Sequence, residues 1–165
     1  MKFIKREDAP QAENLFNQAD KYEEKGDFRR AFDCYLTAAK LGDSWGQVNL
    51  GNYYAAGKGV MRSLEKAAHW YKKAYRNGNS CGALNLAVDK RNQGNIRSAL
   101  VWFQKAVAMN NGDAHLALAK IYTLRGPSGE EKATSLLRRA LRLKKDDISE
   151  AAKEEARALL RSMHK

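Results

Sequence analysis

Small and aromatic residues recur along this chain in a single register, at intervals of roughly 30–40 residues. Three columns of such positions share the same successive gaps. The columns are Ala31, Ala67, Ala99 and Ala133, then Tyr35, Tyr71, Phe103 and Leu137, then Ala38, Ala74, Ala106 and Ala140. A fourth column, Ala19, Gly51, Ala87 and Ala119, interleaves with them. Repeats of this length that are built from helical segments predict a solenoid of helix pairs.

The spacing between columns indicates where the repeats vary. The step from the third column to the fourth, as from Ala38 to Gly51, has the same length each time it occurs. The step within a repeat, from the fourth column to the first, varies in length and is longest from Gly51 to Ala67. Stacking between repeats tolerates no slip, because a shift would turn the apolar face of a helix away from its neighbour. A loop inside a repeat can lengthen at little entropic cost.

The helical pattern covers nearly the whole chain, and no strand-like alternation persists. The two prolines, Pro10 and Pro127, lie outside the interiors of the expected helices. We expect an all-α fold, a right-handed superhelix of four helix pairs followed by a C-terminal capping helix. This would be a single domain over residues 1–165. Its expected parts are units at about 9–42, 44–78, 80–111 and 112–145, and a capping helix at 147–164 that Asp146 and Asp147 would start.

The second unit carries a recognisable motif. It reads Leu50-Gly51, Tyr54, Gly57-Lys58-Gly59-Val60, Ser63, Lys66-Ala67 and Trp70-Tyr71-Lys72-Lys73-Ala74. This pattern resembles the Sel1-like repeat, a relative of the tetratricopeptide repeat. Ser63 stands where the family usually has Asp, and both residues are good helix N-caps. Units one and three are closer to the tetratricopeptide form. The resemblance implies a helical solenoid that serves as an adaptor or scaffold, with many unrelated partners across the family.

Sites for catalysis or cofactors are not apparent. None of the three histidines, His69, His115 and His164, has a partner at metal-binding spacing. Gly57-Lys58-Gly59 lacks the ending of a phosphate-binding loop, and no catalytic triad or paired carboxylates stand out. Cys34 and Cys81 are expected to be reduced, buried small hydrophobes. We therefore expect a protein that is not an enzyme and needs no cofactor.

The inner, concave face is the better candidate for a binding site, because the first helix of each pair lines it in tetratricopeptide-like arrays. By register, the groove would be acidic at its N-terminal end, apolar in its middle and basic at its C-terminal end. Its expected residues are Phe16, Asp20, Glu23, Glu24, Trp45, Val48, Asn52, Leu84, Val88, Arg91, Leu116, Lys120 and Leu124, with Lys153 and Arg157 from the final helix. Apolar side chains left on such a face would bind a partner or pack against a neighbour. The lysines that clamp a C-terminal carboxylate in some related domains are absent, so we do not expect a receptor for chaperone tails.

A second candidate surface follows from charge. The chain has a net charge of +11, and residues 132–145 hold six basic side chains and no acidic one. We call Arg138, Arg139, Arg142 and Lys145 the basic flank, and expect them on the outer face of a second helix. A solvated face is the ordinary explanation for such a stripe, and an acidic partner protein is the alternative. Nucleic acid is a weaker candidate, because no aromatic side chains interleave with the stripe.

Together these features favour a bacterial, cytoplasmic module that binds another protein in its groove. One alternative is an immunity protein that neutralises a toxin, and a second is a nucleic-acid-binding module that uses the basic flank. The first eight residues, MKFIKRED, lead us to expect neither a secretory signal nor a membrane anchor there. The sequence does not indicate the oligomeric state.

Overall fold

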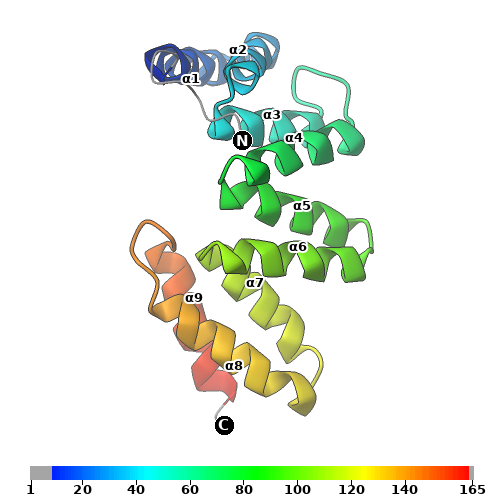
Figure 1. Cartoon of the computed structure of the whole chain (residues 1–165), viewed down its shortest axis with the longest axis vertical. Coiled ribbons are helices and arrows are strands. Elements are labelled where there is room, and N and C mark those ends of the chain that lie inside the picture. Colours follow the sequence, from blue (N-terminus) through cyan, green and yellow to red (C-terminus); the bar gives the residue numbers. More distant parts are fainter. Residues whose placement is uncertain (1–8, 164–165) are drawn as a thin grey trace. The chain divides into compact units, whose positions relative to one another are not determined.

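The computed structural model describes residues 9–163, and within this range it contains nine helices and no strand (Figure 1). The helices are α1 (Ala9–Glu24), α2 (Phe28–Leu41), α3 (Ser44–Ala56), α4 (Leu64–Arg76), α5 (Ser80–Asn92), α6 (Ile96–Ala108), α7 (Gly112–Thr123), α8 (Pro127–Leu141) and α9 (Glu150–Met163). The predicted all-α helical repeat fold is confirmed. The N-terminal segment MKFIKRED and His164 lie outside the described residues.

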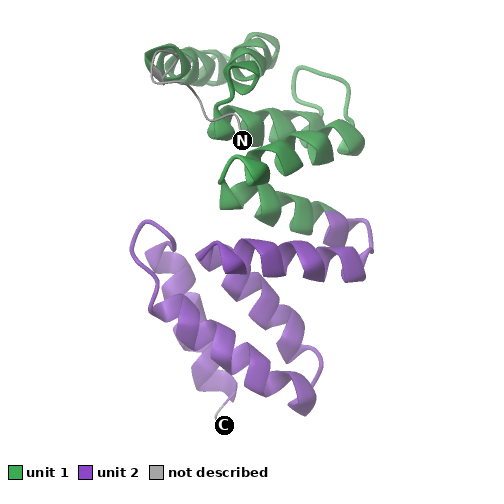
Figure 2. Cartoon of the chain, in the orientation of Figure 1, with its two compact units in different colours: residues 1–89 green, residues 90–165 purple. Residues whose placement is uncertain are grey.

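Contacts divide the chain into two compact units, residues 1–89 and residues 90–165, and the boundary falls inside α5 (Figure 2). We call them unit 1 and unit 2 and describe each by itself. Unit 1 holds the first two predicted repeats and the start of the third. Unit 2 holds the rest of the third repeat, the fourth repeat and the last helix.

Local sequence signals account for where the helices begin and end. Asp27 and Ser63 cap α2 and α4, with their side-chain oxygens accepting hydrogen bonds from the backbone N–H groups of Arg30 (3.1 Å) and Lys66 (3.2 Å). Gly42 ends α2 in the left-handed conformation, with φ of 100°. Asp43 then caps α3 at once, so that the turn between two repeats is very short.

The columns of small residues lie where helices cross, as predicted. Ala31, Ala67, Ala99 and Ala133 have no exposed surface, and the other alanine columns are equally buried. Gly82 on α5 shows how close a crossing can be, because a Cβ atom there would lie 2.8 Å from the backbone nitrogen of Tyr75 on α4. Side chains larger than these would push the helices apart.

Aromatic rings fill the core of unit 1 beside the small residues. The ring of Tyr35 packs edge-on against Phe16 on one side, with centroids 5.7 Å apart, and against Tyr53 on the other, at 5.3 Å. Phe32 packs edge-on against Tyr54 at 5.3 Å. This core joins α1, α2 and α3, and edge-on pairs stabilise beyond their buried area by about 0.5–1.5 kcal/mol each.

The start of the last helix in unit 2 corrects a prediction. Helix α9 begins at Glu150, and Ser149 rather than Asp146 or Asp147 caps it, because the Ser149 hydroxyl accepts from the N–H of Ala152 at 3.2 Å. The buried small residues of α9 are Ala152 and Ala156. Ala152 and Ala156 pack with residues of α7 and α8, so α9 covers the end of unit 2.

Candidate functional site

The predicted groove residues of unit 1 lie on α1, α3 and α5, the first helices of their repeats. Trp45, Val48 and Asn52 are three and four positions apart on α3, which places them on one side of that helix. Only Trp45 is an exposed apolar residue there, with 55% of its surface accessible, whereas Val48 is only 3% exposed. Leu84 and Val88 on α5 are half-buried. The predicted apolar middle of the groove is therefore wrong for Val48, whose side chain is already buried within the fold.

Asn52 is a polar residue on this side of unit 1 whose side chain is held by hydrogen bonds. Its side-chain oxygen accepts two hydrogen bonds of 2.8 Å, one from the Tyr71 hydroxyl and one from the amide nitrogen of Asn85. Tyr71 reaches Asn52 from α4 because the neighbouring residue on α3 is Gly51. With both oxygen bonds made inside the fold, the amide N–H groups of Asn52 are the part left for a ligand, and the side chain is exposed.

Three carboxylates of α1, those of Asp20, Glu23 and Glu24, make the acidic end of this face. The Tyr53 hydroxyl donates to the carboxylate of Glu23, which joins α3 to α1. Burial raises the pKa of Tyr53, and the neighbouring Glu23 raises it further. Burial also raises the pKa of Tyr35, followed by the charges of Glu23 and Asp20. Both tyrosines stay neutral and can donate, so they orient the carboxylates, while Asp20 and the next acidic residue, Glu24, are exposed.

In unit 2 the predicted groove residues differ in burial and in ion pairing. Leu116 on α7 is 7% exposed and packs with Ile148 and the alanines of α9, so its predicted role as an exposed apolar contact is wrong. Lys120 forms an ion pair with Glu155 of α9 at 2.5 Å, which compensates part of the basic charge predicted for this end. Leu124 is 88% exposed.

The remaining predicted cations of unit 2 are divided between exposed and compensated positions. Arg91 on α5 is exposed. Lys153 on α9 pairs with Glu150 at 3.2 Å, and its side chain is only 14% exposed. The last predicted groove residue, Arg157, pairs with Glu154 at 3.1 Å.

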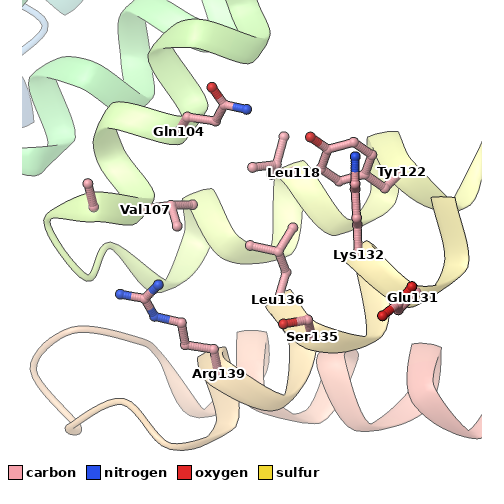
Figure 3. Close-up of a pocket in the computed structure, with 10 residues that line it drawn as sticks. Gln104, Val107, Leu118, Tyr122, Glu131, Lys132, Ser135, Leu136 and Arg139 are labelled. Carbon is pink, nitrogen blue, oxygen red and sulfur yellow. The ribbon is translucent and has the colours of Figure 1, made fainter.

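The basic flank is exposed on α8 and the segment that follows it, at Arg138, Arg139, Arg142 and Lys145. Arg139 also stands at one end of a pocket of about 590 Å³ between α6, α7 and α8 (Figure 3). Val107, Leu118 and Leu136 form the apolar part of this pocket, and Lys132 lies beside Tyr122 at the other end. The pocket combines apolar surface with a rim of mixed charge.

The described residues contain no group of three or more His, Cys, Asp or Glu side chains that could hold a metal ion. His69 is exposed and packs edge-on against Trp70, whereas His115 is fully buried. Cys34 is buried and Cys81 is half-buried. Burial raises the pKa of the Cys34 thiol, with a smaller effect from Asp33, which disfavours a reactive thiolate. Across residues 9–163, the helices are too short or too polar to span a bilayer.

Sequence reasoning missed the polar partners of the predicted groove residues. Tyr53 and Asn85 were not among the predicted residues, although they bind Glu23 and Asn52. A signal for part of this arrangement was present in the columns. Repeats with Tyr in the aromatic column, at Tyr35 and Tyr71, have Asp or Asn directly after the small residue of the fourth column, whereas repeats with Phe or Leu have Val or Lys there.

Comparison with known proteins identifies the family. The Sel1 repeat model matches residues 20–43, 46–79 and 88–111, which are three successive repeats. The chain therefore belongs to the Sel1 repeat family, as the motif of its second unit suggested. Proteins of this family are protein-interaction modules. A search of curated protein sequences found no match.

Solved structures support the same fold. A Sel1 repeat protein from Oxalobacter formigenes is 20% identical with a TM-score of 0.70, and the similarity covers 96% of this chain and 69% of that protein. The protein c5321, a protective antigen of uropathogenic Escherichia coli, is also 20% identical, with a TM-score of 0.68 and 93% of this chain covered. This chain spans only 35% of c5321. The immunity protein Pa5087 from Pseudomonas aeruginosa is 16% identical, and its TM-score of 0.42 supports no conclusion about this chain.

Proposed function

We propose that this chain is a non-catalytic adaptor that binds an extended segment of a partner protein on the first-helix face of unit 1. The observation that carries the proposal is the orientation of Asn52. Its oxygen is occupied by Tyr71 and Asn85, and because the residue is exposed, its amide N–H groups would be the groups that donate to a ligand. A side-chain amide held in this way suits the carbonyl groups of an extended peptide backbone.

Two further features support this choice of ligand. Trp45 is on the same side of α3 as Asn52 and is exposed, so it offers a large apolar surface to a side chain of the partner. Tryptophan is among the residues that dominate binding energy at interfaces. The exposed carboxylates of Asp20 and Glu24 would favour a basic residue at the end of the segment that lies over α1.

The test uses peptides selected against the chain from a random displayed library, with dissociation constants measured by calorimetry. Asn52→Asp is the decisive variant, because it keeps an oxygen for Tyr71 and Asn85 and removes the outward donors. We expect it to weaken binding by about tenfold or more, as should Trp45→Ala. Asn14→Asp is the matched control, since Asn14 is exposed on another side of α1 and its oxygen already accepts from Gln18 at 3.2 Å.

Thermal denaturation of each variant checks that the fold is intact. The proposal fails if Asn52→Asp and Trp45→Ala bind the selected peptides as tightly as the unmodified chain. It also fails if the control loses as much affinity as Asn52→Asp, because the loss would then follow from added negative charge alone. If the selected peptides protect only the basic flank from chemical modification, the binding site lies in unit 2 and the proposal is wrong.

A further inference from the structure

A basic pocket of about 660 Å³ lies between the C-terminal ends of α2 and α4 in unit 1. Every residue that lines the pocket lies on α2 or α4, or is the C-cap residue of one of these helices. The lining residues are Lys40, Leu41, Gly42, His69, Lys73, Arg76 and Asn77. The pocket is thus built from different helices than the first-helix face, and it does not depend on the function proposed for that face.

Cationic side chains gather in this pocket with no acidic side chain in its lining. Lys40, Lys73 and Arg76 are cations, yet no carboxylate lines the pocket. Among the described residues, no ion pair involves these side chains. A basic residue near the C-terminus of a helix is favourable by itself. That effect does not explain why two helix ends bring their cations to the same pocket, where the charges repel one another.

Several contacts fix the pocket before any ligand arrives. Gln47 of α3 is fully buried, and its side chain donates to the carbonyl of Ala39 at 3.3 Å and accepts from the amide of Asn77 at 3.1 Å. It therefore ties the end of α2 to the end of α4. The Nζ atom of Lys73 lies 4.7 Å from the centre of the Trp70 ring, and the Nε of Arg76 donates to the carbonyl of Lys72 at 3.3 Å.

We propose that this pocket binds an oligophosphate, a ligand with two or more linked phosphate groups. Its volume is within the range of small-molecule sites. Arginine suits phosphate because its planar fork can donate two parallel hydrogen bonds, and lysines add point charges. Because the cations come from two helix ends, they suit a chain of linked phosphates better than a single anion such as phosphate or sulfate. No Phe, Tyr or Trp side chain lines the pocket, so the proposal concerns the phosphates of the ligand rather than a stacked nucleobase.

The experiment is calorimetry of the whole chain with inorganic triphosphate, pyrophosphate, phosphate and sulfate, in about 0.15 M salt, where charges more than about 8 Å apart are screened. We expect affinity to fall from triphosphate to pyrophosphate to the single anions. The double variant Lys40→Gln with Arg76→Gln should weaken triphosphate binding by about tenfold or more. The control, Arg138→Gln with Arg142→Gln, removes the same charge from the basic flank and should change affinity by less than about twofold.

Amide chemical shifts of the labelled chain locate the site independently. Triphosphate should shift the amides of residues 39–42 and 69–77, and Arg76→Lys, which keeps the charge and loses the fork, should bind more weakly than the unmodified chain. Equal losses in the pocket variant and the flank control would overturn the proposal, because binding would then follow net charge. Shifts spread over all basic surfaces, or equal affinity for triphosphate and sulfate, would overturn it as well.

Discussion

Replacing Gly51 by Ala tests the packing that joins the fold to the proposed binding face. A Cβ atom at position 51 would lie 2.6 Å from Cδ1 and 3.1 Å from Cζ of the Tyr71 ring, which is 2% exposed and has no room to turn away. The same ring carries the hydroxyl that bonds Asn52 at 2.8 Å. The substitution should therefore crowd the crossing of α3 and α4, and it should also weaken the hydrogen bond between Tyr71 and Asn52.

Opposing effects decide whether Gly51→Ala raises or lowers the free energy of unfolding. Alanine stabilises the interior of a helix by about 0.5–1 kcal/mol relative to glycine. Crowding a packed core costs about 1–3 kcal/mol, and a weakened hydrogen bond costs about 1 kcal/mol. The net expectation is a loss of about 1–3 kcal/mol of unfolding free energy, or a fall in Tm of about 2–4 °C for each kcal/mol in a chain of this size.

The assay is thermal and urea denaturation followed by circular dichroism, with Ala158→Gly as calibration. Ala158 is exposed within α9, so this change measures helix propensity alone, at about 1 kcal/mol. Adding Tyr71→Leu to Gly51→Ala should relieve the crowding and give an interaction energy of about 1 kcal/mol or more in a double-mutant cycle. If Gly51→Ala raises Tm, the ring does not occupy this space and the account of the crossing is wrong.

Three other predictions follow from buried and paired groups. Ala99 has no exposed surface, so Ala99→Leu should overpack the interior and cost about 1–3 kcal/mol; melting like the unmodified chain would show that the repeat register is wrong. Burial lowers the pKa of His115, so the unfolded chain takes up the proton first, and stability should fall as pH drops below about 6.5. Tm measured over a series of pH values should depend less on pH in His115→Gln than in the unmodified chain. If the dependence is the same in both, other groups cause it. Lys120→Ala should cost less than about 1 kcal/mol, because its ion pair with Glu155 is half-exposed, and a larger loss in urea denaturation would contradict this.

The sequence was sufficient for the fold because the repeat columns report packing directly. A residue that must be small at a helix crossing, such as Ala31 or Ala133, is small for a reason that recurs in every repeat. Loop signals such as Ser63 and Gly42 depend only on neighbouring residues, so they could also be predicted. The last helix was placed less well, because no following repeat fixed its register.

The candidate site was less predictable, because exposure on a concave face depends on which helix covers which side chain. Val48 and Leu116 occupy register positions expected to face a ligand, and both are buried. Leu116 is covered by residues of α9, whose register could not be read from the columns. The basic pocket was equally hidden, because Lys40 and Arg76 belong to different repeats and only the fold brings their helix ends together.

The polar bonds of unit 1 explain why the binding face is proposed there rather than in unit 2. When a tyrosine ring packs against the small residue of the fourth column, its hydroxyl lies beside the next residue of the first helix. An acceptor at that position can take the hydrogen bond that the hydroxyl donates. Tyr71 meets such an acceptor in Asn52, whereas the fourth repeat has Leu137 in the same column and needs none. Lys120, the equivalent of Asn52, turns instead to Glu155 of α9. One column thus couples core composition to the chemistry of the face, and under the proposed function we expect the peptide to bind at the repeats that have tyrosine in this column.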